Sequence, residues 1–345
     1  MRIVGLDILR SVAILLVLFR HSQLFNCPLF DFGWLGVDLF FVLSGFLVSG
    51  LIFSEYKKRN KLNTKRFLLR RGFKIYPAFY IFLAGSILIE HYRDGFVPTL
   101  PDLLGEIFYM QSYLSHIWTH TWSLAVEEHF YLAIALLSFI AYKTKSLDKQ
   151  KLVIPVLISL IVLSFCMRLY VSYPHRNEPF FSFMATHLRS DGILIGILIG
   201  YLYHFTSFFQ FFVKWRWVFL LISAILMAPG FMYPGGSYTM NTLGLSTVNL
   251  GFGLLTLFSL TNLRLPTQAL RTSLQPIVYL LTLIGRHSYS IYLWHIACRN
   301  FMNDHFHYGA NLNSLLFFIL SISVGIILSL IIERPFLKIR DRYVP

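Results

Sequence analysis

Residues 5–24 of the chain read GLDILRSVAILLVLFRHSQL. About 20 mainly apolar residues are enough for a helix to cross a bilayer. This segment nevertheless contains Asp7, Arg10 and His21. Ionisable side chains inside a membrane helix are costly unless they are paired or hydrated, and they commonly mark functional sites. The segment therefore predicts a membrane helix that does more than anchor the chain.

The composition of the whole chain supports a membrane protein. Of its 345 residues, 56% are hydrophobic and only 13% are charged, and the mean hydropathy is +0.62. A soluble protein of this size rarely reaches such values, because a polar surface must cover its core. We predict an all-α polytopic membrane protein, residues 1–345 forming a single domain of about ten spans: 5–24, 34–56, 75–91, 122–142, 152–172, 189–205, 215–232, 243–262, 287–302 and 312–332.

The formal net charge of +14 is distributed as the positive-inside rule expects. Segment 57–74 has nine Lys and Arg residues and segment 143–151 has four, whereas the loops 91–118 and 173–188 have one each. This asymmetry predicts that both termini are cytoplasmic. Lipid headgroups and an anionic cofactor are therefore more plausible partners than nucleic acid.

The first span places two basic side chains on one helix face. Arg10 and His21 are eleven residues apart, a rotation that ends about 20° past three full turns, with an axial separation of about 16 Å. Asp7 precedes Arg10 by one turn and can pair with it. The alternative interpretation is an Arg that extends to the inner surface and an interfacial His near the outer one.

The second span and the basic segment after it contain further polar residues. Asp38 needs a basic partner elsewhere in the bundle, and Ser44 with the following glycine indicates close helix packing. Arg71 and Lys74, preceded by Arg70, are one helical turn apart and could bind an anionic ligand on the cytoplasmic side. The alternative is that this basic cluster only anchors the topology.

Polar residues also stand at the ends of later spans. Glu127 is one of two adjacent acids at the start of an apolar helix, where they suit the helix dipole or could orient His21. Arg189 and Asp191 can pair with each other or with partners on other helices. His295 is either a second polar site or a packed, hydrogen-bonded residue.

Other chemistries lack a signal in the sequence. The three cysteines, Cys27, Cys166 and Cys298, form no CxxC pair, so they indicate neither a zinc site nor a disulfide framework. No GxSxG, HExxH or Walker motif occurs, and we predict no metal.

Six motifs occur in an order that resembles the membrane acyltransferase-3 family. They are Arg10-x10-His21, GVDLFFVLSGFL (36–47), RRGFKIYP (70–77), TWSLAVEEHFYL (121–132), GRHSYSIYLWH (285–295) and ERP (333–335). The resemblance implies a ten-helix protein of the bacterial inner membrane that uses acyl-coenzyme A, mainly acetyl-CoA, to O-acylate surface or exported glycans, including lipid-linked ones. It implies the form without an added periplasmic esterase-like domain.

The resemblance also implies roles for individual residues. His21 is the expected catalytic residue and general base, Arg10 its paired basic residue, and Glu127 the glutamate of the WSLxxE element. The RxxR pair that binds the donor falls on Arg71 and Lys74, and lysine at the second position loses the bidentate fork of arginine.

Two functions outside this class use the same residues. One is a transporter or flippase with a polar site at the membrane midplane, and the other is a non-catalytic member of a glycan-synthesis complex. Paired broken helices in two halves would favour the transporter, and the sequence shows no such symmetry.

Overall fold

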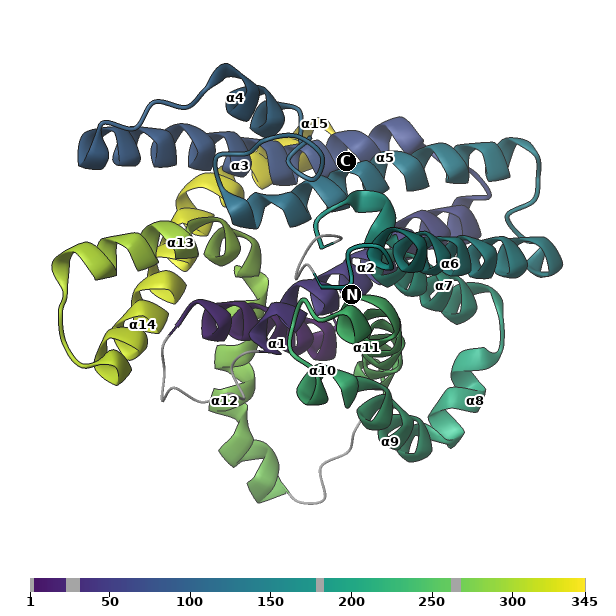
Figure 1. Ribbon diagram of the computed structural model, residues 1–345. Coiled ribbons are helices and arrows are strands. Elements are labelled where there is room, and N and C mark those ends of the chain that lie inside the picture. Colours follow the sequence, from purple (N-terminus) through teal and green to yellow (C-terminus); the bar gives the residue numbers. More distant parts are fainter. Residues whose placement is uncertain (1–2, 23–31, 178–182, 262–267, 345) are drawn as a thin grey trace.

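The computed structural model describes residues 3–22, 32–177, 183–261 and 268–344, with the backbone alone at 268–272. Every regular element in these ranges is a helix, and no strand occurs in them. In Figure 1, α1 lies near the centre, α13 and α14 lie on one side of it, and α7, α9 and α11 lie on the other. The prediction of an all-α fold is confirmed.

Each of the ten predicted spans coincides with a helix. In chain order these helices are α1 (Val4–His21), α2 (Leu35–Arg59), α3 (Thr64–Asp94), α5 (Trp122–Lys143), α6 (Gln150–Ser172), α7 (Ser190–Phe205), α9 (Arg216–Met227), α11 (Leu245–Ser259), α13 (Ser288–His305) and α14 (Ala310–Leu328). Shorter or peripheral helices are α4 (Leu100–Ile107), α8 (Phe208–Lys214), α10 (Pro229–Met232), α12 (Gln268–Arg286) and α15 (Arg334–Tyr343).

Not all of these helices have the length and hydropathy of a membrane span. Six helices in the described ranges are long and apolar enough to cross a membrane, and α7 with α8, bent by 97°, makes a seventh candidate. The predicted first, seventh and ninth spans are not among them. Helix α9 has only 12 residues, and α1 contains Asp7, Arg10 and Arg20. The predicted count of ten is therefore not confirmed.

Helix α3 begins earlier than the predicted span at 75. Asn63 caps it, because the Asn63 side chain accepts a hydrogen bond from the Arg66 amide at 2.9 Å. The basic segment up to Lys74 is therefore helical. Arg71 and Lys74 lie on this helix one turn apart, so their side chains project from the same side of it.

Helix α2 is the central packing element. A Cβ atom at Gly45 would lie 2.1 Å from the Ile193 carbonyl oxygen of α7, and one at Gly196 would lie 2.2 Å from the Val42 oxygen. Only glycine permits this approach of the two backbones. The packing role predicted at this part of α2 is confirmed for Gly45.

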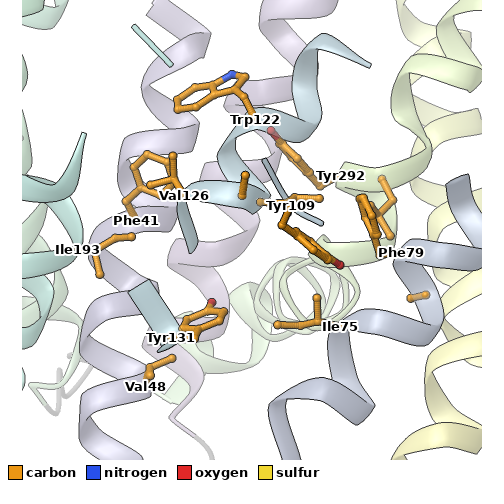
Figure 2. Close-up of a cluster of buried hydrophobic side chains, with 14 of the residues drawn as sticks. Phe41, Val48, Ile75, Phe79, Tyr109, Trp122, Val126, Tyr131, Ile193 and Tyr292 are labelled. Carbon is orange, nitrogen blue, oxygen red and sulfur yellow. The ribbon is translucent and has the colours of Figure 1, made fainter. Parts of the chain in front are cut away.

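A large buried cluster of hydrophobic side chains joins α2, α3, α5, α7 and α13. Figure 2 shows part of it, with Trp122 and Tyr131 from α5 and Tyr292 from α13. Near the N-terminal end of α3, Arg70 pairs with Asp341 of α15 at 3.0 Å. The C-terminal helix thus lies beside the basic segment 57–74.

Candidate functional site

A cavity of about 380 Å³ lies between α1, α2, α3, α5 and α13. Its walls are largely apolar and aromatic, and its polar groups come from helices far apart in the sequence. The cavity brings together six of the predicted site residues: Asp7, Arg10, Ser44, Arg71, Lys74 and Glu127. An apolar cavity with a few convergent polar groups is the usual form of a small-molecule site.

Arg10 is held at the junction of α12 and α13. Its Nε donates to the Gly285 carbonyl oxygen at 3.2 Å, and its Nη2 donates to Ser288 Oγ at 3.0 Å. Asp7 lies near Arg286, with 3.8 Å between Asp7 Oδ2 and Arg286 Nε. These contacts fix the Arg10 guanidinium at the cavity wall.

Tyr131 organises the opposite wall. Its hydroxyl donates to Glu127 Oε2 at 2.5 Å, so Ser44 Oγ, 2.6 Å away, donates to Tyr131. The Arg71 guanidinium lies over the Tyr131 ring, 4.1 Å from its centroid, a favourable cation–π contact. Ser44, predicted as a packing residue, therefore also supports Glu127 through this hydroxyl.

Several charged atoms of the cavity have no protein partner. Arg71 Nε and Glu128 Oε1 are buried without a hydrogen bond among the described residues. Glu128 Oε2 accepts from Tyr76 at 3.1 Å. The Lys74 side chain lines the same cavity. The site therefore has hydrogen-bonding capacity for a polar ligand.

His21 does not line this cavity. Its half-buried ring packs against His295 of α13, with 5.0 Å between centroids. Since Arg10 also contacts α13, the two residues face the same helix, as their spacing predicted. His120 completes a cluster of three rings, its centroid 5.2 Å from that of His295.

His120 was not identified from the sequence. It lies in the 3₁₀ turn η3 (Thr119–Thr121), just before α5. The available signal was a histidine at the start of an apolar helix that already showed Glu127 and Glu128. The adjacent acids Glu127 and Glu128, which lie in the cavity, are the stronger polar signal at this helix start.

One layer of side chains connects the cavity with the histidines. Ser123 and Tyr292 both line the cavity, and their hydroxyls are 2.6 Å apart. The Tyr292 hydroxyl donates to the His120 carbonyl oxygen at 2.7 Å. The Tyr292 ring lies 5.6 Å from the His295 ring, so Tyr292 contacts both sites.

Glu106 fixes the loop that presents His120. Its Oε1 accepts from the Ile117 and Trp118 amides, each at 3.1 Å, and from Thr121 Oγ1 at 3.0 Å. Its Oε2 accepts from Gln111 at 2.8 Å. Burial raises the pKa of the Glu106 carboxyl, and these hydrogen bonds oppose the rise. Glu106 lies on α4, outside the predicted spans, and had no signal in the sequence.

The family of the chain is shown by comparison with known proteins. A family described as "Acyltransferase domain" matches residues 3–334. The chain belongs to this acyltransferase family.

Several curated relatives from Staphylococcus aureus are similar to this acyltransferase. "Putative O-acetyltransferase SACOL0978" of strain COL is 27% identical over 340 residues, which cover 88% of this chain and 51% of the relative. "O-acetyltransferase OatA" of strain NCTC 8325 / PS 47 is 26% identical over 334 residues, with coverage of 88% and 52%. The chain spans about half the length of the curated relatives it matches. No solved structure matches it.

The acyltransferase also contains a second set of charges, away from the cavity. Asp38 Oδ1 accepts from Arg189 Nη2 at 2.8 Å, and Asp191 pairs with Arg168 through two hydrogen bonds of 3.0 and 2.7 Å. The Arg189 guanidinium lies 4.5 Å from the Phe183 ring centroid. Of the two alternatives for Arg189 and Asp191, the structure has the second, since each pairs with a partner on another helix, and the basic partner of Asp38 is Arg189.

Arg168 was missed within the apolar run of span 152–172. Its signal is the spacing of Ser164, Arg168 and Ser172, which lie four residues apart and are buried on one face of α6. Most other side chains of this helix are exposed, as lipid contact requires.

The last predicted site residues differ in their surroundings. Arg70 is not among the cavity residues, and it contacts Asp341 and the Val344 carbonyl oxygen on α15 and after it. His295 is fully buried and belongs to the histidine cluster. Among the described residues, no group of His, Cys, Asp and Glu is arranged to hold a metal ion.

Proposed function

We propose that this acyltransferase moves an acetyl group from acetyl-CoA to a hydroxyl of a cell-surface or exported carbohydrate, in the bacterial cytoplasmic membrane. Membership of the acyltransferase family supports the reaction class. The printed names of relatives similar to the chain, O-acetyltransferases, support acetyl transfer to oxygen. The observation that carries the proposal is the position of the cavity, which only the side chains of Ser123 and Tyr292 separate from the cluster of His21, His120 and His295.

The cavity is the proposed donor site. Arg71 and Lys74 lie on the segment that the charge asymmetry places in the cytoplasm, where acetyl-CoA is made. Their charges suit the phosphates of the donor, and the unpartnered Arg71 Nε can donate to one of them. Arg10, held by Gly285 and Ser288, lies deeper in the same cavity and contacts the donor arm. Glu127 holds Tyr131 under Arg71.

His21 is the proposed general base. The acceptor hydroxyl gives its proton to a ring nitrogen of His21 while its oxygen attacks the thioester carbonyl carbon. The carbon–sulfur bond then breaks, the acetyl group stays on the acceptor oxygen, and the thiolate takes the proton from His21 to leave as coenzyme A. A histidine ring can accept a proton and return it within one reaction, which suits both transfers.

The arrangement of the two sites supports transfer across the membrane. Arg10 lies near the start of α1 and His21 at its end, an axial separation of about 16 Å. With the N-terminus inside, the donor enters from the cytoplasm and the acetyl group meets an acceptor on the outer side. Movement of Tyr292 and Ser123 would let the extended thioester arm reach the histidines.

Two variants test the proposal in cells and with purified protein. In a strain lacking the gene, His21→Ala should bind labelled acetyl-CoA like the wild type but leave surface glycans without the added O-acetyl groups detected by mass spectrometry. Arg10→Ala should weaken acetyl-CoA binding. Wild-type O-acetylation by the His21→Ala protein would contradict the role of His21, and unchanged glycans after gene deletion would contradict the proposed reaction.

A further inference from the structure

His295 has one ring nitrogen in use and one without a partner. Its Nδ1 lies 2.6 Å from the Tyr292 carbonyl oxygen. Because a carbonyl oxygen only accepts, Nδ1 must bear the hydrogen. In the neutral ring Nε2 is then an acceptor, and it is buried with no hydrogen-bond partner among the described residues. His295 itself has 0% of its surface exposed.

A buried polar atom without a partner is costly, and native structures rarely leave one unsatisfied. The rings of His21 and His120 are its histidine neighbours, and His120 Nε2 lies 3.2 Å from the Leu293 carbonyl oxygen, so that nitrogen of His120 is already a donor to the backbone. His21 remains the neighbouring ring whose nitrogens are not committed to a backbone group in the described structure.

The spacing of the rings suits a hydrogen bond after a small movement. The His21 and His295 centroids are 5.0 Å apart, and the rings are tilted by 52°. Ring nitrogens lie on the rim, so a change in the His21 side-chain torsions can bring one of them within about 2.7–3.2 Å of His295 Nε2. Such contacts are often loose without substrate and tighten in the reacting complex.

We propose that His295 Nε2 accepts a hydrogen bond from His21 and thereby sets the His21 tautomer. The other ring nitrogen of His21 then has no hydrogen and is free to take the proton of the acceptor hydroxyl. His295 is a positioning residue in the sense that it acts through His21. This inference rests on the proposed role of His21 as the base.

The arrangement replaces the carboxylate that usually orients a catalytic histidine. Glu127, the acid predicted for that role, lies in the cavity and is bound by Tyr131. His295 is a neutral acceptor, and its own tautomer is fixed by the backbone of α13. Tyr292, which supplies that carbonyl oxygen, also lines the donor cavity, so the same turn of α13 contacts the donor and orients the base.

Substitutions at His295 separate positioning from packing. His295→Phe keeps a planar ring but removes the acceptor, whereas His295→Gln places an amide oxygen near the position of Nε2. We expect His295→Phe to reduce glycan O-acetylation by about 10²-fold or more, a typical contribution of acid–base catalysis. His295→Gln should recover a substantial part of it. Both proteins should bind acetyl-CoA with wild-type affinity, because the donor cavity is unchanged.

The tautomer of His21 is directly measurable. Nitrogen-15 NMR of protein labelled at histidine, in lipid nanodiscs, distinguishes the two tautomers, and His21→Gln identifies the His21 signals by their loss. One tautomer should dominate in the wild type and in His295→Gln, and a mixture should appear in His295→Phe. His305→Gln, at an exposed position, is the control and should change neither the His21 signals nor the O-acetylation activity.

The outcomes distinguish this inference from the proposed function. An inactive His21→Gln protein together with a fully active His295→Phe protein would overturn the role of His295 and leave the base assignment intact. An active His21→Gln protein would overturn the base assignment itself. If His295→Phe fails to fold, the His21 tautomer in His295→Gln still decides, since a mixture there contradicts the proposed acceptor.

Discussion

The two sets of buried charges in this acyltransferase differ in what surrounds them. Around Asp38 and Asp191, each carboxylate has an arginine partner at 2.7–3.0 Å, and the four side chains are almost completely buried. Around Glu127 and Arg71, the charges face a cavity. Buried atoms without a hydrogen-bond partner among the described residues occur in both sets, Asp38 Oδ2 and Arg189 Nη1 in the first and Arg71 Nε in the second.

The difference distinguishes charges that stabilise the fold from charges that can bind a ligand. Ion pairs enclosed inside a bundle fix how its helices pack, because each partner compensates the buried charge of the other. Charges that face a cavity can also be reached by a ligand, which can complete their hydrogen bonds. In a membrane segment both sets look equally unusual, so charge alone cannot assign a function.

The largest expected effect on stability is at the ion pairs around Asp38 and Asp191. Arg168→Met removes one partner of a buried ion pair and leaves Asp191 without compensation, which should cost about 3–5 kcal/mol in the free energy of unfolding. Thermal unfolding in detergent and the yield of monodisperse protein measure it. Adding Asp191→Asn to this variant removes the lone charge and should recover much of the stability. Equal stability of wild type and Arg168→Met would remove the distinction between the two sets.

An intermediate effect is expected at the cavity. Arg71→Met removes a cation that the proposal assigns to donor phosphates, so the Kd for acetyl-CoA should rise by roughly 10- to 100-fold, since a hydrogen bond to a charged group contributes about 1.5–3 kcal/mol. Titration calorimetry with purified protein measures it, and thermal unfolding should change little. A large loss of stability with unchanged donor affinity would place Arg71 with the structural charges.

The smallest effect is expected at Arg70, which was predicted to bind the donor and which the structure places against α15. Its ion pair with the half-exposed Asp341 should contribute at most about 1 kcal/mol to stability. Arg70→Met should therefore leave the Kd for acetyl-CoA within about twofold of the wild type and serve as the matched control for Arg71→Met. A loss of affinity as large as that of Arg71→Met would instead support the original prediction for Arg70.

The sequence by itself determined the fold class, the positions of the helices and the family. Apolar runs of membrane length can form only helices or closed barrels in lipid, because backbone groups must bond within the segment or the barrel. Helical periodicity also placed Arg10 and His21 on one face, and both contact α13. These features depend on local chemistry and on spacing along one helix, which a single sequence contains.

Only the tertiary structure decided which charges act together. Asp38 and Arg189 are far apart in the chain. The contacts of Arg168 and His120 depend on how α6 and η3 pack against their neighbours. The position of Arg71 over the Tyr131 ring, and of His21 next to His295, depends on how α1, α3, α5 and α13 pack. Residues on different helices meet through contacts distant in sequence, and neither hydropathy nor periodicity records which helix faces which.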